Sequence, residues 1–153
     1  MRDTILILIQ FIFLTVTSTA QEYSFLDLTI RDGLPQSQVN TIIQDTKGQL
    51  WIGTEGGGLT KYDGLNFEII TTREGIPSNT INTLYKSKNN DIWIGTNTGF
   101  AKLVNNKIIE KYYSELSIKS IAYQSDSTLW IGYQDGIYVF HKGKQHLFKP
   151  GFN

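Results

Sequence analysis

The sequence predicts an all-β protein, and three observations lead to that prediction. A pentapeptide with tryptophan at its second position occurs three times, short apolar or β-branched runs alternate with turn residues, and no segment shows an amphipathic helical period. The 153 residues allow one small domain at most. The 14 basic and 14 acidic side chains cancel, so the charge that binding to nucleic acid or to an anionic membrane surface requires is missing.

Residues 1–20 have the pattern of a secretory signal peptide. Arg2 precedes an apolar run over residues 5–16, and the small residues Ser18 and Ala20 follow it. The run is too short to cross the roughly 30 Å hydrocarbon core of a bilayer. We expect cleavage after Ala20 and an exported mature chain. The alternative is a short buried helix or an uncleaved anchor.

The repeated pentapeptide defines units of about forty residues. It occupies residues 50–54, 92–96 and 129–133, so that its tryptophans are 42 and 37 residues apart. A Gly-Leu-Pro or Gly-Ile-Pro motif stands before the first two copies, and a glycine follows each tryptophan six residues later, at Gly57, Gly99 and Gly136. The shared offsets divide the chain into units over residues 33–74, 75–116 and 117–153.

Each unit contains four short runs that are typical of strands. In the first unit we expect strands over residues 39–44, 49–54, 59–62 and 67–71, joined by turns over residues 45–48, 55–58 and 63–66. Glycine supplies positive φ in such turns, and Asp and Asn side chains bond their own backbone. The corresponding turns of the later units fall at residues 87–90, 97–99, 105–106, 125–128, 134–136 and 142–143.

Four strands in about 42 residues are the content of one β-propeller blade. Both faces of the second strand carry apolar residues or glycine, which only neighbouring layers can cover. The sequence therefore predicts a partial β-propeller of about three four-stranded blades, with tryptophans that serve as core rather than as ligand platforms. Residues 23–29 align with residues 65–71, so we expect residues 21–32 to form a leading outer strand.

These motifs resemble the two-component regulator propeller repeat, which is known from the sensor regions of hybrid two-component system histidine kinases of Bacteroidetes-type bacteria. The residues that carry the resemblance are 33–35, 39–45, 48–54, 57–59 and 62–63. The third unit departs from the pattern, because it lacks Gly-Leu-Pro, has Tyr133 in place of threonine and is five residues shorter.

The resemblance implies an extracytoplasmic, ligand-sensing segment of a signal transduction receptor. It also implies a periplasmic location, a membrane tether in the full-length parent, and further blades followed by a small β-sandwich, a membrane helix and a kinase or other output domain. The ligand would be an environmental molecule such as an oligosaccharide, and its binding residues stay unassigned. The chain is too short for the four blades of the smallest propellers. We therefore expect an N-terminal fragment whose partners are the remaining blades and domains and whose uncovered blade faces favour self-association.

Two other functions remain open at this stage. One is a secreted propeller that binds carbohydrate or protein without kinase output. The other is a propeller enzyme, such as a lyase or glycosidase, whose catalytic cluster would come from additional blades.

The candidate residues for chemistry all have simpler structural interpretations. We interpret the turn carboxylates as Asx-turn residues, the two histidines as a solvated pair rather than a metal site, and the glycine-rich segment 53–58 as a hairpin turn rather than a phosphate loop. The exposed tyrosines are interpreted as cover for sheet faces. We therefore expect a non-enzyme without cofactor, metal or catalytic residues. The candidates are Asp45, Glu55, Asp63, Asp135, His141, His146, Tyr62, Tyr112, Tyr113, Tyr133 and Tyr138.

Overall fold

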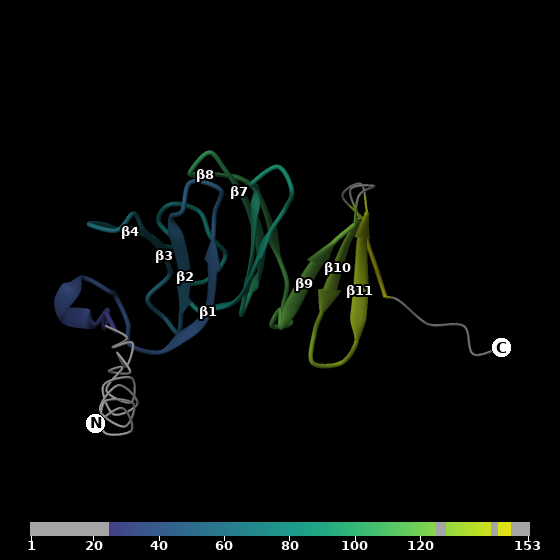
Figure 1. Cartoon of the computed structure of the whole chain (residues 1–153). Coiled ribbons are helices and arrows are strands. Elements are labelled where there is room, and N and C mark those ends of the chain that lie inside the picture. The colour runs from purple at the N-terminus through teal and green to yellow at the C-terminus, as the bar shows by residue number, and fades with distance from the viewer. Residues whose placement is uncertain (1–24, 125–127, 142–143, 148–153) are drawn as a thin grey trace, which may run out of the picture.

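The computed structural model describes residues 25–124, 128–141 and 144–147, and the expected leader over residues 1–20 lies outside them. The described residues form three four-stranded antiparallel sheets, in which each strand pairs with the next strand of the chain (Figure 1). This confirms the predicted all-β fold. Within the described part of the chain, no helix combines the length and the apolar content that a membrane crossing requires.

The strands follow the turn pattern of the sequence. The first sheet contains β1 (Val39–Gln44), β2 (Leu50–Thr54), β3 (Leu59–Tyr62) and β4 (Phe67–Ile70). The second contains β5 (Ile81–Lys86), β6 (Ile92–Thr96), β7 (Gly99–Val104) and β8 (Lys107–Tyr113). The third contains β9 (Ser120–Tyr123), β10 (Thr128–Gly132), β11 (Ile137–His141) and β12 (Lys144–Leu147). In the first unit the expected strands differ from the observed ones only by a single residue at the start of β2 and at the end of β4.

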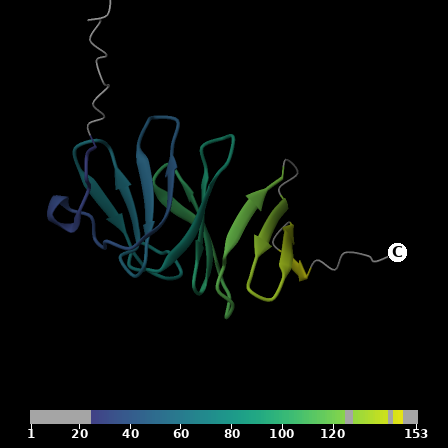
Figure 2. The same ribbon diagram turned by 60° about the horizontal axis from the view of Figure 1, so that its bottom comes forward.

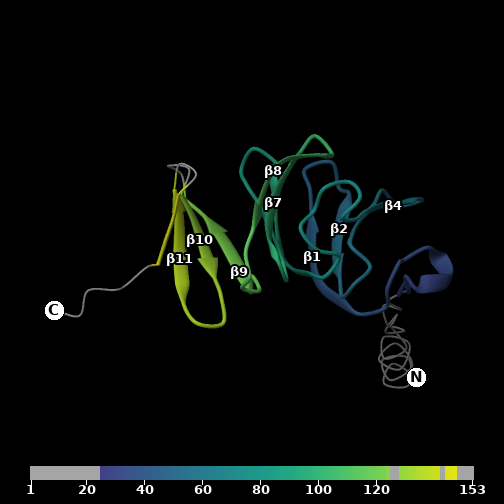
Figure 3. The same cartoon turned by 180° about the vertical axis from the view of Figure 1, so that it is seen from behind.

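The three sheets fan out from their first strands. β5 contacts β1 on one side and β9 on the other, whereas the outer strands β4, β8 and β12 lie apart. The turned views in Figures 2 and 3 show the same succession of sheets. Sheets that meet at their first strands and diverge at their last are the blades of a propeller.

The leading strand expected over residues 21–32 is not formed in its described part. Residues 25–29 have no regular structure, and η1 (Ile30–Asp32) is a single 3-10 turn. A lone extended segment has no ladder partner for its backbone groups, whereas this turn satisfies them locally. The Asp32 carboxylate accepts from the amide and the hydroxyl of Thr29, both at 2.8 Å, in a capping box.

The same turn recurs before the second unit and explains the Gly-Leu-Pro motif. The Glu74 carboxylate accepts from the amide and the hydroxyl of Thr71, both at 2.7 Å. Gly33 and Gly75 then reverse the chain with φ of 116° and 111°, which a residue with a side chain rarely adopts. The next apolar residue of each motif, Leu34 or Ile76, is buried. In the first two units the motif therefore fixes a buried apolar side chain at the entry to the blade.

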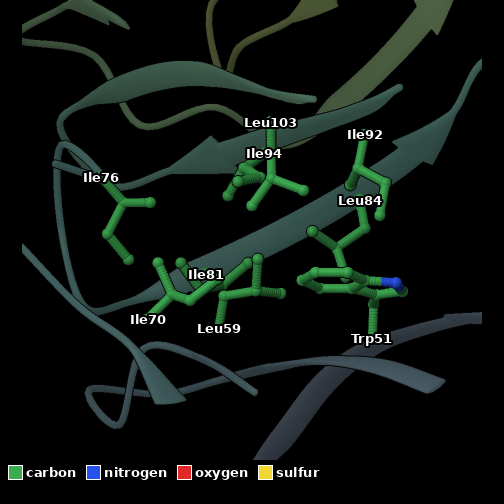
Figure 4. Close-up of a cluster of buried hydrophobic side chains, with 9 residues drawn as sticks. All are labelled: Trp51, Leu59, Ile70, Ile76, Ile81, Leu84, Ile92, Ile94 and Leu103. Atoms are coloured by element: carbon green, nitrogen blue, oxygen red, sulfur yellow. The ribbon is translucent and has the colours of Figure 1, made fainter. Parts of the chain in front are cut away.

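The core consists of side chains packed between successive sheets. Figure 4 shows Trp51 of β2 beside Leu84 of the second sheet, and Trp51 is only 1% exposed. Trp93 occupies the same place between the second and third sheets and is 5% exposed. Trp130 of the third sheet is half-buried. The core interpretation of the first two tryptophans is thus confirmed, and each packs on the following blade.

Asparagines in bulges fasten each sheet to the next. The pairing of β1 with β2 and of β5 with β6 slips by one residue at Asn40 and at Asn82, respectively. The Asn40 amide donates to the Ile81 carbonyl oxygen at 3.0 Å, and the Asn82 amide donates to the Ile118 carbonyl oxygen at 2.9 Å. We call this contact the asparagine clasp. It connects the first strands at the centre of the fan.

Candidate ligand-binding hollow

The turn between β1 and β2 supplies a hydrogen-bond acceptor for the indole N–H of the tryptophan in the first unit. Asp45 is buried, and its Oδ2 accepts from Trp51 Nε1 at 3.1 Å. Its Oδ1 accepts from the amides of Lys47 at 2.8 Å and Gln49 at 3.0 Å. Burial raises the pKa of this carboxyl, but the hydrogen bonds from Trp51, Gln49 and Lys47 outweigh burial and hold the pKa below its usual range.

The second unit has a shorter side chain at the same position. Ser87 stands six residues before Trp93, as Asp45 stands six residues before Trp51, and Ser87 Oγ accepts from the Asp91 amide at 3.1 Å. Trp93 Nε1 is buried and has no hydrogen-bond partner among the described residues. In the third unit Gln124 restores the contact, since its Oε1 accepts from Trp130 Nε1 at 3.0 Å. The unpartnered indole N–H is therefore particular to the second unit.

This indole borders a hollow of about 470 Å³ between the second and third sheets. The hollow is formed by the turn between β5 and β6, by side chains of β5, β6 and β7, and by the end of β9. Its lining residues are Tyr85, Ser87, Lys88, Asn89, Asp91, Trp93, Lys102, Tyr123 and Gln124. The equivalent space between the first and second sheets measures only about 160 Å³, and Asp45 lies in it.

Aromatic rings form the apolar wall of the hollow. Tyr123 stacks on Trp93 with ring centroids 6.5 Å apart and planes at 24°, and it lies 6.5 Å from the Tyr85 ring. The Lys102 ammonium lies 5.4 Å from the centroid of the Trp93 ring, within cation–π distance. Such a wall suits the flat or apolar body of a small molecule.

The hollow has two donor groups that the described residues leave unused, whereas two of its acceptor groups are already in contact with donors. The Asp91 carboxylate is occupied by the Lys102 ammonium at 3.2 Å, and Gln124 Oε1 is occupied by the indole of Trp130. The indole N–H of Trp93 remains unused, and the Lys88 ammonium makes no ion pair with a described residue. The arrangement can therefore bind a molecule that presents hydrogen-bond acceptors.

The described residues bring no metal-binding cluster together. No group of three or more His, Asp or Glu side chains in that part of the chain could hold a metal ion.

Asp63 accepts from the amides of Leu65 and Asn66 within its own turn, as an Asx-turn residue does. The Glu55 carboxylate makes a contact outside its own turn, because it accepts from the side-chain amide of Asn40 at 2.9 Å, beside the clasp. The Asp135 carboxylate lies near the Tyr138 hydroxyl. Burial and, to a smaller extent, the charge of this carboxylate raise the pKa of Tyr138.

The two histidines differ in what the structure describes. His141 Nδ1 lies 2.9 Å from the Thr128 hydroxyl across β10 and β11, so its ring is held within the sheet. The side chain of His146 lies outside the described residues. The segment 53–58 consists of the end of β2 and the turn to β3, where the Thr54 hydroxyl donates to the Gly58 carbonyl oxygen at 2.9 Å.

The candidate tyrosines are spread over three sheets rather than gathered at one place. Tyr62 stacks on Phe67, with ring centroids 4.6 Å apart, and Tyr133 meets Tyr138 edge-on. Tyr112 packs on Phe100 and Phe140, and burial together with its hydrogen bond to Glu110 raises the pKa of Tyr112 to about 12. Tyr113 is exposed. None of these tyrosines lines the hollow.

The residues of the hollow were not predicted from the sequence. One signal was present, because the position six residues before each tryptophan changes from Asp45 to Ser87 to Gln124. Its meaning depends on the geometry of the turn, which aims this side chain at the indole nitrogen. Tyr85 and Tyr123 carried no separate signal, since tyrosine is an ordinary strand residue.

Comparison with known sequences agrees with the repeat. The profile of a family described as "Two component regulator propeller" matches residues 33–56 and 75–98. Histidine kinase P4 of Formosa agariphila is 48% identical to this chain over 63 residues, which cover 40% of this chain and 4% of the kinase.

Two solved structures from B. thetaiotaomicron share the fold. Both are described as extracellular domains of hybrid two component systems. BT4673 superposes with a TM-score of 0.72 at 15% identity over 88% of this chain, and BT3049 with a TM-score of 0.70 at 23% identity over 85%. This chain spans 19% of the length of each solved chain.

Proposed function

This chain carries two-component regulator propeller repeats, and from that premise we propose that it is the extracytoplasmic ligand-sensing segment of a two-component-type receptor. In this role the blades contribute to a sensor region outside the cytoplasm. The parent receptor is tethered in the membrane and carries the output domain, and the segment itself performs no catalysis. The environmental ligand to test first is an oligosaccharide released from a polysaccharide.

One observation carries the proposal. The two sequence units that match the repeat family are the units that fold into the first two blades, and the whole array has the fold of extracellular domains of hybrid two component systems. A propeller fold by itself hosts many functions. The repeat match is the feature that favours a sensor over the secreted binding module and over the propeller enzyme.

Sensing requires a ligand that binds two states of the receptor with different affinity. The test is to express the full-length parent with a reporter of its output and to apply a panel of oligosaccharides. We expect one ligand both to raise the melting temperature of the purified extracellular region and to change the reporter. A protein found in the culture medium with no membrane-bound form would contradict the receptor role and support the secreted module.

A further inference from the structure

The second unit lacks an internal carboxylate that the first unit uses. In the first unit Asp45 gives one oxygen to Trp51 Nε1 and the other to two backbone amides. In the second unit Ser87 lies at the same place in the turn, because its amide donates to the Asp91 carbonyl oxygen at 2.9 Å, just as the Asp45 amide donates to the Gln49 carbonyl oxygen at 3.0 Å. The two turns share this backbone hydrogen bond, but only the turn of the first unit has a carboxylate at this position.

The place of the missing carboxylate opens into the hollow beside Trp93. Ser87, Asp91 and Trp93 all line the hollow. Trp93 is 5% exposed, and its indole nitrogen is buried without a hydrogen-bond partner among the described residues. A buried donor without an acceptor is unfavourable, so a molecule that supplies an acceptor at this place gains affinity. A carboxylate supplies the same oxygens that Asp45 supplies in the first unit.

The surrounding charges also favour an anion. Two ammonium groups, those of Lys88 and Lys102, and one carboxylate, that of Asp91, line the hollow. The Lys102 ammonium lies 3.2 Å from Asp91 Oδ2 and 3.9 Å from Glu110 Oε1. Lys88 at the rim makes no ion pair with any described residue. An incoming carboxylate therefore meets an uncompensated ammonium and an unused indole N–H.

We propose that the hollow between the second and third blades binds a small carboxylate, whose oxygens take the place that the Asp45 side chain has in the first blade. The body of the ligand lies against Tyr85 and Tyr123. The biological purpose of this binding rests on the proposed sensor function. The binding itself does not, because it is measured on the isolated chain.

The test follows the indole N–H resonances of the ¹⁵N-labelled chain, which has three tryptophans. The probes are acetate, benzoate and glucuronate, with benzamide and glucose as the neutral counterparts of the last two. We expect a carboxylate to shift the Trp93 resonance in a saturable manner and to leave the Trp51 resonance in place. Comparing benzoate with glucuronate identifies whether the body of the ligand is an aromatic ring or a sugar ring.

Two substitutions separate the site from general effects. Ser87→Asp places an internal carboxylate beside the indole, and we expect it to weaken binding of the carboxylates at least tenfold. Trp93→Phe keeps an aromatic ring but removes the indole N–H, and it should also weaken binding at least tenfold; its affinity is followed by the backbone amide resonance of Asp91, which lines the hollow. Asn66→Asp adds the same charge as Ser87→Asp in the exposed turn between β3 and β4, and it should leave affinity within twofold.

Several results would overturn the proposal. These are the absence of a saturable shift at Trp93, equal binding of the neutral counterparts, and unchanged affinity in Ser87→Asp. Failure of the parent receptor to signal in response to a carboxylate that does bind would leave the site intact and count against the proposed function. The two ideas can therefore fail separately.

Discussion

Asp45 carries two opposing effects on one carboxylate. Burial raises its pKa, whereas the hydrogen bonds from Trp51, Gln49 and Lys47 lower it by more. The folded-state pKa is therefore below the ordinary value of about 4. A carboxyl with a lowered pKa stabilises the fold above its unfolded-state pKa, and this contribution is lost as the pH falls through the folded-state pKa.

We therefore expect Asp45→Asn to reduce the steepness with which the free energy of unfolding declines between about pH 5 and pH 2. The physical reason is that the amide does not titrate, although its oxygen can still accept from Trp51. Urea denaturation at a series of pH values measures this slope. An unchanged slope would show that the ionisation of Asp45 is not linked to folding.

Gly95 illustrates how tightly the blades approach one another. A Cβ atom at this residue would lie 2.6 Å from Thr83 Cγ2 and 2.7 Å from Ile118 Cγ2, the latter on the segment that enters the third sheet. We expect Gly95→Ala to lower the free energy of unfolding by about 1–3 kcal/mol, because two side chains must move in a packed interior. Chemical denaturation measures the loss.

A matched control for this prediction lies in an open turn. Gly56 has no heavy atom within 4 Å of a built Cβ, and its φ of 84° is a conformation that asparagine tolerates. Gly56→Asn should change the free energy of unfolding by less than about 1 kcal/mol. Equal losses at Gly95 and Gly56 would contradict the close-approach argument.

Strands and turns are the elements that could be predicted from the sequence. Turn chemistry is local, so Asp63 and the glycine-rich segments placed the hairpins almost to the residue. The bulges at Asn40 and Asn82 could not be placed in the same way, because a bulge depends on which residue of the partner strand is opposite. The capping turn over residues 29–32 was missed for a different reason, since its apolar residues also fit a strand.

The asparagine clasp gives a prediction at the scale of two sheets. The Asn82 amide reaches Asn97 Oδ1, Ser117 Oγ and the Ile118 carbonyl oxygen at distances of 2.9–3.0 Å. We expect Asn82→Ala to lower the free energy of unfolding by about 1–3 kcal/mol, because the part-buried acceptors, Ser117 Oγ and the Ile118 carbonyl oxygen, lose their donor. Denaturation curves test this, with Lys107→Ala on the exposed start of β8 as the control. A loss no larger than that of the control would mean that the clasp is not stabilising.

At the scale of the whole molecule, one face of the first sheet carries exposed apolar side chains on its two edge strands, β1 and β4. Ile42 and Ile69 lie in the same cross-strand row as Ile52, on the face of the first sheet opposite to Trp51. Ile52 is 4% exposed, but Ile42 is 58% exposed and Ile69 is 41% exposed. Exposed apolar side chains on a sheet face favour association with another surface.

We expect the chain to associate reversibly at micromolar concentration and the double substitution Ile42→Lys, Ile69→Lys to shift it toward the monomer. Added charge on the face opposes contact with a second copy. Sedimentation velocity measures the distribution. Leu65→Lys makes the same chemical change at an exposed turn, and it should not alter association. If the unsubstituted chain were a monomer at all concentrations, this expectation would be contradicted.

The clasp is not continued at the third sheet. By alignment of the units, Lys119 stands where Asn40 and Asn82 stand, and its amide group donates to the Gly132 carbonyl oxygen at 2.7 Å within its own sheet. A lysine ammonium can also donate a hydrogen bond, but its long and flexible side chain fixes the donor less rigidly than the short, planar amide of asparagine does. A further layer stacked on the third sheet would consequently lack this asparagine contact, and we expect it to rotate about that seam more easily than about either of the two preceding seams.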